Sequence, residues 1–369
     1  MKKWPSFPLG TAIELAYGKS LPKGDRVDDG GIPVYGSNGI TGWHDTAVVD
    51  GPTVIVGRKG SAGAVQFVDG PCFPIDTTYY ARPREGFDFD IKFLFYLLRR
   101  LDLSRLKTAT GVPGLTREDA YRETIPVPPL PEQRRLVDLL SRAEGIVRLR
   151  REAEKKAAEL IPALFLDMFG DPMKNPKGWP VTQLDAFLIF LTSGSRGWAE
   201  YYAPSGARFI RSLDVRMNEI STDAAVYVNA PDGAEAERTR VKFGDVLLTI
   251  TGSQIGRVAS APADLEGAYI SQHVAILRLT SGIESKYLSI FLSLDVGGQR
   301  EISRLQYGQT KPGLNLKQIR EFLIPLPPLR LQKDFVERVE SNRSIQSQQV
   351  EATIKAKATF DALLAQTFS

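Results

Sequence analysis

Two glycine turns, each following an apolar run, carry the side chains with the clearest chemical potential. They are Arg58, Lys59 and Ser61 in the first turn and Ser253, Gln254 and Arg257 in the second. Arginine and lysine bind phosphate or guanine, and glutamine and arginine hydrogen-bond to base edges in the major groove. Plain hairpins with glycine at positive φ would suit the same residues, so both interpretations stay open. The G-x-x-x-x-G-K-[ST] spacing of a nucleotide phosphate loop is absent.

A second set of candidates lies beside predicted strands: Arg211, Ser212, Arg216, Thr78 and Gln272. The first three follow a short apolar run at 209–210, and for them we favour contact with DNA over a structural role. The other two occupy matching places, before or at a predicted strand, where a polar side chain could face either solvent or a groove.

Two loops that precede predicted short helices hold a third set: Lys107 and Thr110 in the first loop, Gln309 and Lys311 in the second. A helix N-terminus combined with hydroxyl, amide or ammonium donors is a natural phosphate clamp. The arginines at 99, 100 and 105 would extend the first one. A solvated helix face would have the same composition, so this alternative also stays open.

Other residues argue against a catalytic or metal centre. The histidines, His44 and His273, and the single Cys72 cannot supply a zinc site. An adenine methyltransferase would carry Asn/Asp-Pro-Pro-Tyr/Phe, which the segment 175–178 (Asn-Pro-Lys-Gly) does not provide. A nuclease needs clustered carboxylates with a lysine on a strand edge, but the carboxylates at 152–154 fall in a predicted long helix. We therefore expect a chain that is not an enzyme and holds no metal or cofactor.

The elements that must position the candidate residues are duplicated. Residues 121–130 read YRETIPVPPL and residues 320–329 read REFLIPLPPL, with their isoleucines offset by 199 positions. This offset continues without a gap over 112–169. The starts of the copies, 4–9 and 179–184, are offset by 175, so the second copy is longer by 24 residues. A duplicated binding unit on one chain suits a ligand that is itself bipartite.

Each copy consists of a globular segment, 1–128 or 170–327, followed by a long helical segment, 129–169 or 328–369. In the globular segments, β-branched runs alternate with Gly- and Asp-rich turns, which predicts strands in hairpins or a small barrel-like sheet, together with shorter helices. The expected fold class is α+β, with two similar β-rich globules.

The long segments have proline-rich entries and a narrow apolar stripe. Pro131 suits the first helical turn and Pro162 is expected to bend the last turns, whereas Arg330 leaves the second helix start less well marked. The first stripe comprises Leu136, Leu139, Leu140, Ala143, Ile146, Leu149, Ala153 and Leu160. Three- and four-residue spacing of this kind favours an antiparallel coiled coil between the two helices. The alternative is that each helix packs on its own globule.

The composition excludes some classes of protein. The chain has 369 residues, ordinary apolar content and a formal net charge of only +4, so a polyanion site would require local clustering of basic residues. One cysteine fits a reducing cytosol. No basic-then-apolar leader or long apolar run is present, and we expect a cytoplasmic chain that is neither exported nor embedded in a membrane.

Four stretches carry a family resemblance: IPVPPLPEQRRLVDLL (125–140), IPLPPLRLQKDFVERV (324–339), ATGVPGLTREDA (109–120) and DVLLTITGSQIGRV (245–258). With the duplication, they make the chain resemble the specificity subunit of a type I restriction–modification system. The resemblance covers essentially the whole chain. Duplication combined with the Pro-Pro-Leu helix entry is its specific part.

This resemblance implies two target recognition domains, each reading one half of a split, asymmetric DNA sequence. The long helices would act as a ruler between them and as the dock for two methyltransferase subunits, which would bind S-adenosylmethionine, with restriction subunits joining the complex. Tyr35 and Asn38 lie where the family presents a recognition loop, although a tight turn would also explain them. The alternative function is a tandem scaffold or glycan-binding module without nucleic acid, which would show no salt-dependent DNA binding.

Overall fold

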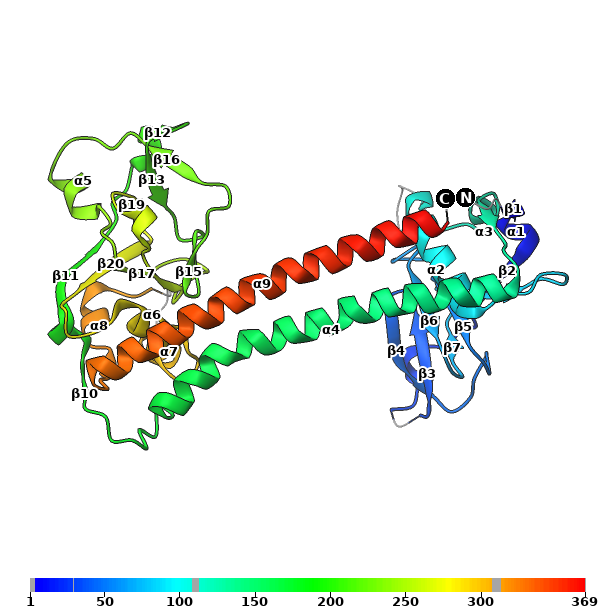
Figure 1. Cartoon of the computed structure of the whole chain (residues 1–369), viewed down its shortest axis with the longest axis horizontal. Helices are drawn as coiled ribbons and strands as arrows, with labels where there is room; N and C mark the ends of the chain where they lie inside the picture. The colour runs from blue at the N-terminus through cyan, green and yellow to red at the C-terminus, as the bar shows by residue number, and fades with distance from the viewer. Residues whose placement is uncertain (1–3, 29, 108–112, 307–312, 369) are drawn as a thin grey trace. The chain divides into compact units, whose positions relative to one another are not determined.

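The computed structural model describes residues 4–28, 30–107, 113–306 and 313–368 (Figure 1). The chain divides into two compact units, residues 1–153 with 349–369 and residues 154–348. The long helices α4 (Leu130–Phe169) and α9 (Leu329–Thr367) each contribute one part to each unit. The predicted four-part division along the sequence stays a prediction.

The first unit is built around a four-stranded antiparallel sheet of order β2-β8-β5-β6. Its strands are Ile13–Tyr17 (β2), Thr78–Pro83 (β8), Thr53–Gly57 (β5) and Val65–Val68 (β6). A second sheet, of order β4-β3-β7, comprises Gly39–His44 (β4), Ile32–Gly36 (β3) and Phe73–Pro74 (β7), and Ser6–Pro8 (β1) pairs with Thr124–Pro126 (β9). The shorter helices are α1 (Leu9–Ala12), α2 (Ile91–Leu101), α3 (Arg117–Tyr121) and the 3₁₀ turns η1 (Lys23–Asp25) and η2 (Leu103–Leu106).

The second unit has the same central sheet, of order β11-β20-β17-β18. These strands are Leu188–Ser193 (β11), Val274–Leu279 (β20), Val246–Thr249 (β17) and Val258–Ser260 (β18). The other strands are Tyr202–Ala203 (β12), Val226–Val228 (β16), Ala207–Ile210 (β13), Tyr269–Ile270 (β19), Val215–Arg216 (β14), Glu219–Ile220 (β15), Val181–Gln183 (β10) and Leu323–Pro325 (β21). The helices are α5 (Ala234–Thr239), α6 (Ser285–Ser293), α7 (Gly298–Gln306), α8 (Leu316–Arg320) and the 3₁₀ turns η3 (Leu184–Phe187), η4 (Trp198–Tyr201) and η5 (Ala263–Leu265).

Equivalent hydrogen bonds show that the two copies share one fold. The buried Gln133 accepts from the backbone N–H of Asp90 at 2.9 Å and donates to the carbonyl of Pro128 at 2.9 Å. Gln332, which lies 199 positions later and is also buried, makes the same two bonds at 3.0 and 2.8 Å with equivalent residues. Each glutamine thereby fastens the proline-rich entry of a long helix to the start of α2 or α6.

The long helices begin at equivalent residues, Leu130 and Leu329. Arg330, which stands where the first copy has Pro131, therefore does not change where the second helix starts, because the buried glutamine fixes the entry in both copies. The first helix also continues through Pro162 to Phe169.

Within each unit the two long helices run antiparallel and pack together. In the first unit, Leu140 and Val147 of α4 form one buried cluster with Phe360 and Leu364 of α9 and with Tyr96 of α2. The guanidinium of Arg150 donates to the side-chain oxygen of Gln349 at 3.1 Å, and these residues are 199 positions apart. A residue paired with its own repeat equivalent marks an internal two-fold relationship between the helices.

In the second unit, three aromatic side chains join the helices to the globular part. Phe165 and Phe169 of α4 lie edge-on to Phe335 of α9, with ring centroids 5.7 and 5.1 Å apart. Phe165 also stacks on Tyr287 of α6 at 5.8 Å. Both interpretations of the long helices are thus partly right, since the helices pack on one another and also on the globular part of each unit.

The predicted apolar stripe of α4 is divided between two faces. Leu136 and Leu140 are buried, whereas Leu139, Ile146 and Leu149 are exposed. The spacing predicts a single seam, but a helix that buries one narrow face turns its second apolar row outward. This outward row remains available to another molecule.

Candidate nucleic-acid interface

In the first unit, the turn that carries Asn38 and the turn at 58–61 both donate hydrogen bonds to one backbone carbonyl. The carbonyl of Thr77 accepts from the hydroxyl of Ser37 at 2.6 Å and from the backbone N–H groups of Arg58 and Lys59 at 2.9 and 3.1 Å. Ser37 belongs to the turn that carries Asn38. Segments that are distant in the sequence therefore meet at one end of the central sheet.

The segment 113–115 joins the same end. The backbone N–H of Gly60 donates to the carbonyl of Pro113 at 2.9 Å, and that of Leu115 donates to the carbonyl of Arg58 at 2.9 Å. Lys107 is exposed and lies a few positions before this segment, while Thr110 lies outside the described residues. The turn at 58–61 is thus held on both sides by backbone hydrogen bonds.

Exposure separates the candidates that can reach a ligand from one that cannot. Asn38, Lys59 and Ser61 are exposed, and Tyr35 is half-buried. Thr78, in contrast, is fully buried, and its hydroxyl donates to the carbonyl of residue 75 at 2.7 Å. Thr78 therefore stabilises a turn, and its side chain has no surface for contact with DNA.

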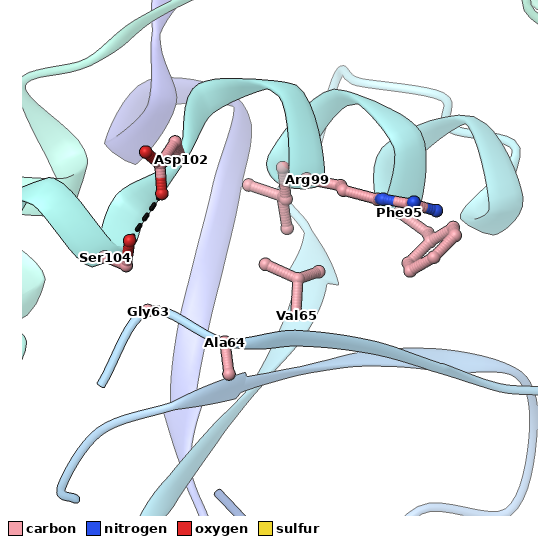
Figure 2. Close-up of a pocket in the computed structure, with 8 residues that line it drawn as sticks. Gly63, Ala64, Val65, Phe95, Arg99, Asp102 and Ser104 are labelled. Atoms are coloured by element: carbon pink, nitrogen blue, oxygen red, sulfur yellow. Dashed lines mark hydrogen bonds between the residues drawn. The ribbon is translucent and has the colours of Figure 1, made fainter. Parts of the chain in front are cut away.

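Beside this turn, a shallow hollow of about 290 Å³ lies between residues 63–65 and α2 (Figure 2). Its arginine, Arg99, is ion-paired with Glu144 at 2.6 Å. Gly63 has φ of +82°, and a Cβ at this position would lie 2.3 Å from the backbone nitrogen of Ser104. Glycine therefore lets the turn pack closely against η2, which leads to Lys107.

Replacement of Gly63 by alanine is expected to lower the free energy of unfolding by roughly 2–4 kcal/mol. About 1–2 kcal/mol comes from left-handed backbone in a residue with Cβ, and the rest comes from displacing η2. Gly60→Ala is the matched control, because Gly60 has φ of +75° but a Cβ added there would meet nothing within 4 Å. Urea unfolding of both variants checks this, and equal losses would contradict the close approach.

The second unit repeats the backbone arrangement with different side chains. The N–H of Ile250 donates to the carbonyl of His273 at 2.9 Å, and the N–H of Leu314 donates to the carbonyl of Ile250 at 2.9 Å. Thr251 Oγ1 lies 2.5 Å from His273 Nδ1. Ile250, His273 and Leu314 occupy the positions of Arg58, Thr77 and Leu115 in the first unit. The two copies therefore share this frame of backbone hydrogen bonds, while the polar side chains on it differ.

The remaining candidates of this turn differ in how much of them is accessible. Ser253 is exposed, and Gln254 and Arg257 are half-buried. Gln309 and Lys311 lie outside the described residues.

Arg211 makes a buried ion pair that the sequence did not reveal. Its Nε and terminal nitrogen donate to the carboxylate of Asp214 at 3.0 and 2.8 Å, and its backbone N–H donates to the same carboxylate at 2.8 Å. The side chain of Asp214 is only 1% exposed and that of Arg211 is 24% exposed. Arg211 therefore holds the loop after β13, which argues for a structural role over the DNA contact favoured from the sequence.

Arg216 differs from Arg211 although it lies in the same loop region. It pairs with Asp223 at 2.7 Å, but 46% of the Arg216 side chain and 77% of the Asp223 side chain are exposed. The hydrogen bond from Arg216 and a second one from Ser221 lower the pKa of Asp223. Arg216 can exchange this partner for a phosphate at little cost.

A cavity of about 310 Å³ lies beside Arg211 in the second unit. It is lined by Trp198, Tyr202, Phe209, Arg211, Ser212, Gln272 and His273, among others. Within the part of the chain that the structure describes, the Ser271 hydroxyl and the Gln272 side-chain oxygen are buried without a hydrogen-bond partner. Gln272 therefore lines the cavity, and its buried side-chain oxygen has unmet hydrogen-bonding capacity.

Sequence reasoning missed two residues of the first unit. The guanidinium carbons of Arg58 and Arg117 lie 4.9 and 4.4 Å from the centroid of the Tyr17 ring. Tyr17 ends β2 and Arg117 begins α3. The missed residues are Tyr17 and Arg117. A comparison of the copies could have found them, because neither has a basic or aromatic counterpart in the second copy.

Over the described ranges, no group of three or more His, Cys, Asp or Glu side chains is arranged to hold a metal ion. Among those same residues, no helix is both long and apolar enough to cross a membrane.

A family model described as the type I restriction modification DNA specificity domain matches residues 1–159 and 216–356 of the chain. The chain is similar to the type I restriction enzyme MjaVIII specificity subunit of Methanocaldococcus jannaschii, with 24% identity over 270 residues, 68% of this chain and 63% of that protein. It is also similar to the type I restriction enzyme EcoBI specificity subunit of Escherichia coli, with 26% identity over 174 residues, 44% of this chain and 35% of that protein. The alignments thus cover less than two thirds of either relative.

Two solved structures share the fold. The S subunit of the type I restriction–modification system from M. genitalium matches with a TM-score of 0.64 and 16% identity, over 99% of this chain and 96% of that one. A chain from a structure of type I R-M complex assembly and conformational transition matches with a TM-score of 0.63 and 20% identity, over 99% and 97%. They confirm the predicted α+β architecture with two similar globules and a long helix pair.

Proposed function

The chain belongs to the type I restriction modification DNA specificity family, and from this we propose that it is the non-catalytic, DNA-reading subunit of a type I restriction–modification complex. The observation that carries the proposal is the duplicated frame with unlike polar surfaces. The turn at 58–61 and its equivalent at 250–253 share two backbone hydrogen bonds, one donated by the first residue of the turn and one accepted by it, yet they present different side chains. Two readers of one architecture with different contacts suit a DNA target whose two halves differ.

We propose that the first half of the target meets Tyr35, Asn38, Arg58, Lys59, Ser61 and Lys107. The second half would meet Arg216, Ser253, Gln254, Arg257 and Gln272. Basic side chains in each set would bind phosphates, and the amides and hydroxyls would hydrogen-bond to base edges. Ser212, Thr110, Gln309 and Lys311 stay predictions.

We further propose that the long helices dock the partner subunits. In the first unit, Leu139, Ile146 and Leu149 of α4 and Val350 and Ile354 of α9 are apolar and exposed. Exposed apolar side chains in rows of this kind typically mark a protein–protein interface. Two methyltransferase subunits, which would bring S-adenosylmethionine, are the partners that this family membership suggests, and restriction subunits would join through the assembled complex.

Co-expression with the cognate methyltransferase subunit tests the function. We expect methylation sequencing of the host DNA to reveal one split, asymmetric motif. The purified complex should bind duplex DNA with an affinity that falls linearly on a log–log plot against salt, by about 0.9 per phosphate contact. A chain that bound no duplex at low salt would instead support the tandem scaffold without nucleic acid.

A further inference from the structure

Two arginines of the first unit share one aromatic ring. Both guanidinium carbons lie within 5 Å of the Tyr17 centroid, at 4.9 Å for Arg58 and 4.4 Å for Arg117. Tyr17 is exposed at the end of the edge strand β2, and both arginines are half-buried. The guanidinium carbons are therefore no more than about 10 Å apart, because each lies on the same ring.

Among the residues that the structure describes, no ion pair neutralises the charges of this Arg58–Tyr17–Arg117 cluster. Among the ion pairs of the described residues, none involves Arg58 or Arg117. Arg58 donates to the backbone carbonyl of Asp76 at 3.0 Å. The Nε–H of Arg117 is buried and has no acceptor within the described part of the chain. Lys59, which is exposed, adds a third positive charge next to the cluster.

A strand pairing and a side-chain hydrogen bond place Tyr17 and Arg117 next to each other. Tyr17 pairs with Tyr79 across β2 and β8, and their rings are 5.2 Å apart. The hydroxyl of Tyr79 donates to the carbonyl of Leu115 at 3.0 Å, two residues before Arg117. Burial raises the pKa of Tyr79 to about 12, so this hydroxyl stays protonated and keeps the α3 entry beside Tyr17.

The second copy shows that the fold does not need this cluster. Its sheet places Ser193 opposite Ala275, as Tyr17 is opposite Tyr79. Ile250 makes the backbone bond to Leu314 that Arg58 makes to Leu115. Leu316 begins α8 as Arg117 begins α3.

The counterparts of the cluster are therefore a serine, an isoleucine and a leucine, and the last two lie in or against the hydrophobic core of the second unit. The second unit therefore folds without cationic groups at these positions. Stacking recovers only about 0.5–1 kcal/mol per exposed cation–π contact, which does not account for placing two unneutralised cations side by side. A ligand that supplies negative charge does account for it.

We propose that Tyr17 holds Arg58 and Arg117 as a clamp for backbone phosphate of the DNA strand that contacts the first unit. The proposal rests on the proposed DNA-reading function and assigns this part of the surface to binding the backbone rather than to base reading. Guanidinium groups bind phosphate oxygens in a fork geometry and stack on aromatic rings at the same time. The clamp belongs to one half of the target only, because the second copy lacks all three groups.

Recognition of guanine is less consistent with the geometry. A base-reading arginine extends into the major groove and offers a free pair of N–H groups to one base edge. Arg58 has one terminal nitrogen bonded to a protein carbonyl and a face covered by the Tyr17 ring. Two cations held within about 10 Å match the repeated charge of a phosphate backbone better than one base edge.

The test uses the full chain in complex with its methyltransferase subunit. Two duplexes of equal length serve as probes, one containing the motif obtained from methylation sequencing and one unrelated. The variants Arg117→Leu and Arg58→Ile carry the second copy's own residues, which favours folding. For Arg117→Leu we expect about tenfold weaker binding of both duplexes and a salt slope smaller by about 0.9, with the preference between them unchanged.

Substitutions of the ring separate the clamp from a general effect on folding. Tyr17→Phe keeps the ring and should bind like the unaltered protein, whereas Tyr17→Ser should reproduce the loss seen for Arg117→Leu. An unchanged salt slope in a folded Arg117→Leu variant, or a loss confined to one base position, would overturn the clamp. Absence of salt-dependent binding by the unaltered complex would instead overturn the DNA-reading function.

Discussion

Seven residues inserted after Arg150 and seven inserted after Gln349 are expected to lengthen the gap between the two halves of the DNA target by about three base pairs. The helix rises about 1.5 Å per residue, so each insertion adds roughly 10 Å, and B-DNA rises 3.4 Å per base pair. The two points are equivalent in the duplication and hydrogen-bonded to one another. Seven residues are close to two full turns, so the packed faces keep their phase.

Methylation sequencing of cells that carry the variant and the methyltransferase subunit gives the measurement. The original motif should lose methylation, and a motif with the same half-sites and a longer gap should gain it. Inserting two residues at each point is the control, because it rotates the packed faces by about 200° and should abolish methylation of either motif. Methylation of the original motif by the seven-residue variant would show that the helices do not set the distance.

Arg211→Ala is expected to lower the free energy of unfolding by about 2–3 kcal/mol. Removing one partner of a buried ion pair leaves the other charge uncompensated, which typically costs about 3–5 kcal/mol. The loss here should be smaller, since Asp214 keeps the backbone N–H of residue 211 and has Arg208 at 3.9 Å. Urea unfolding of the purified chain provides the measurement.

Arg216→Ala is the matched control from the same loop region. Its ion pair with Asp223 is largely exposed, and exposed pairs of this kind contribute little to stability. We expect Arg216→Ala to keep the unfolding midpoint and to weaken DNA binding with a smaller salt slope. If Arg211→Ala kept full stability and lost discrimination in one half-site, Arg211 would be the base reader that the sequence suggested.

The sequence predicted the features that depend on local pattern. The duplication, the proline-rich helix entries and the two long helices follow from spacing and composition over short windows, and the structure has them. Even the entry at Arg330 could have been settled, because the glutamine that fixes it stands 199 positions after Gln133 in an unbroken alignment.

The sequence failed where a side chain's role depends on a partner from another strand or turn. Thr78 and Arg211 are both polar residues beside strands, but one is buried under the sheet end and the other is paired with Asp214. Tyr17 and Arg117 are 100 positions apart and meet only because β2 pairs with β8 and Tyr79 reaches Leu115. Propensity and spacing do not carry this information.

The way in which α9 completes the first unit bears on how the chain is made. Phe360 and Leu364 belong to the same buried cluster as Tyr96, so the unit that begins first in the sequence lacks part of its core until residues 349–368 have been synthesised. The other unit is continuous in sequence, from 154 to 348, and all of its core residues leave the ribosome earlier. Domains fold as units during translation. The second unit, although it starts later in the sequence, should therefore finish folding before the first unit.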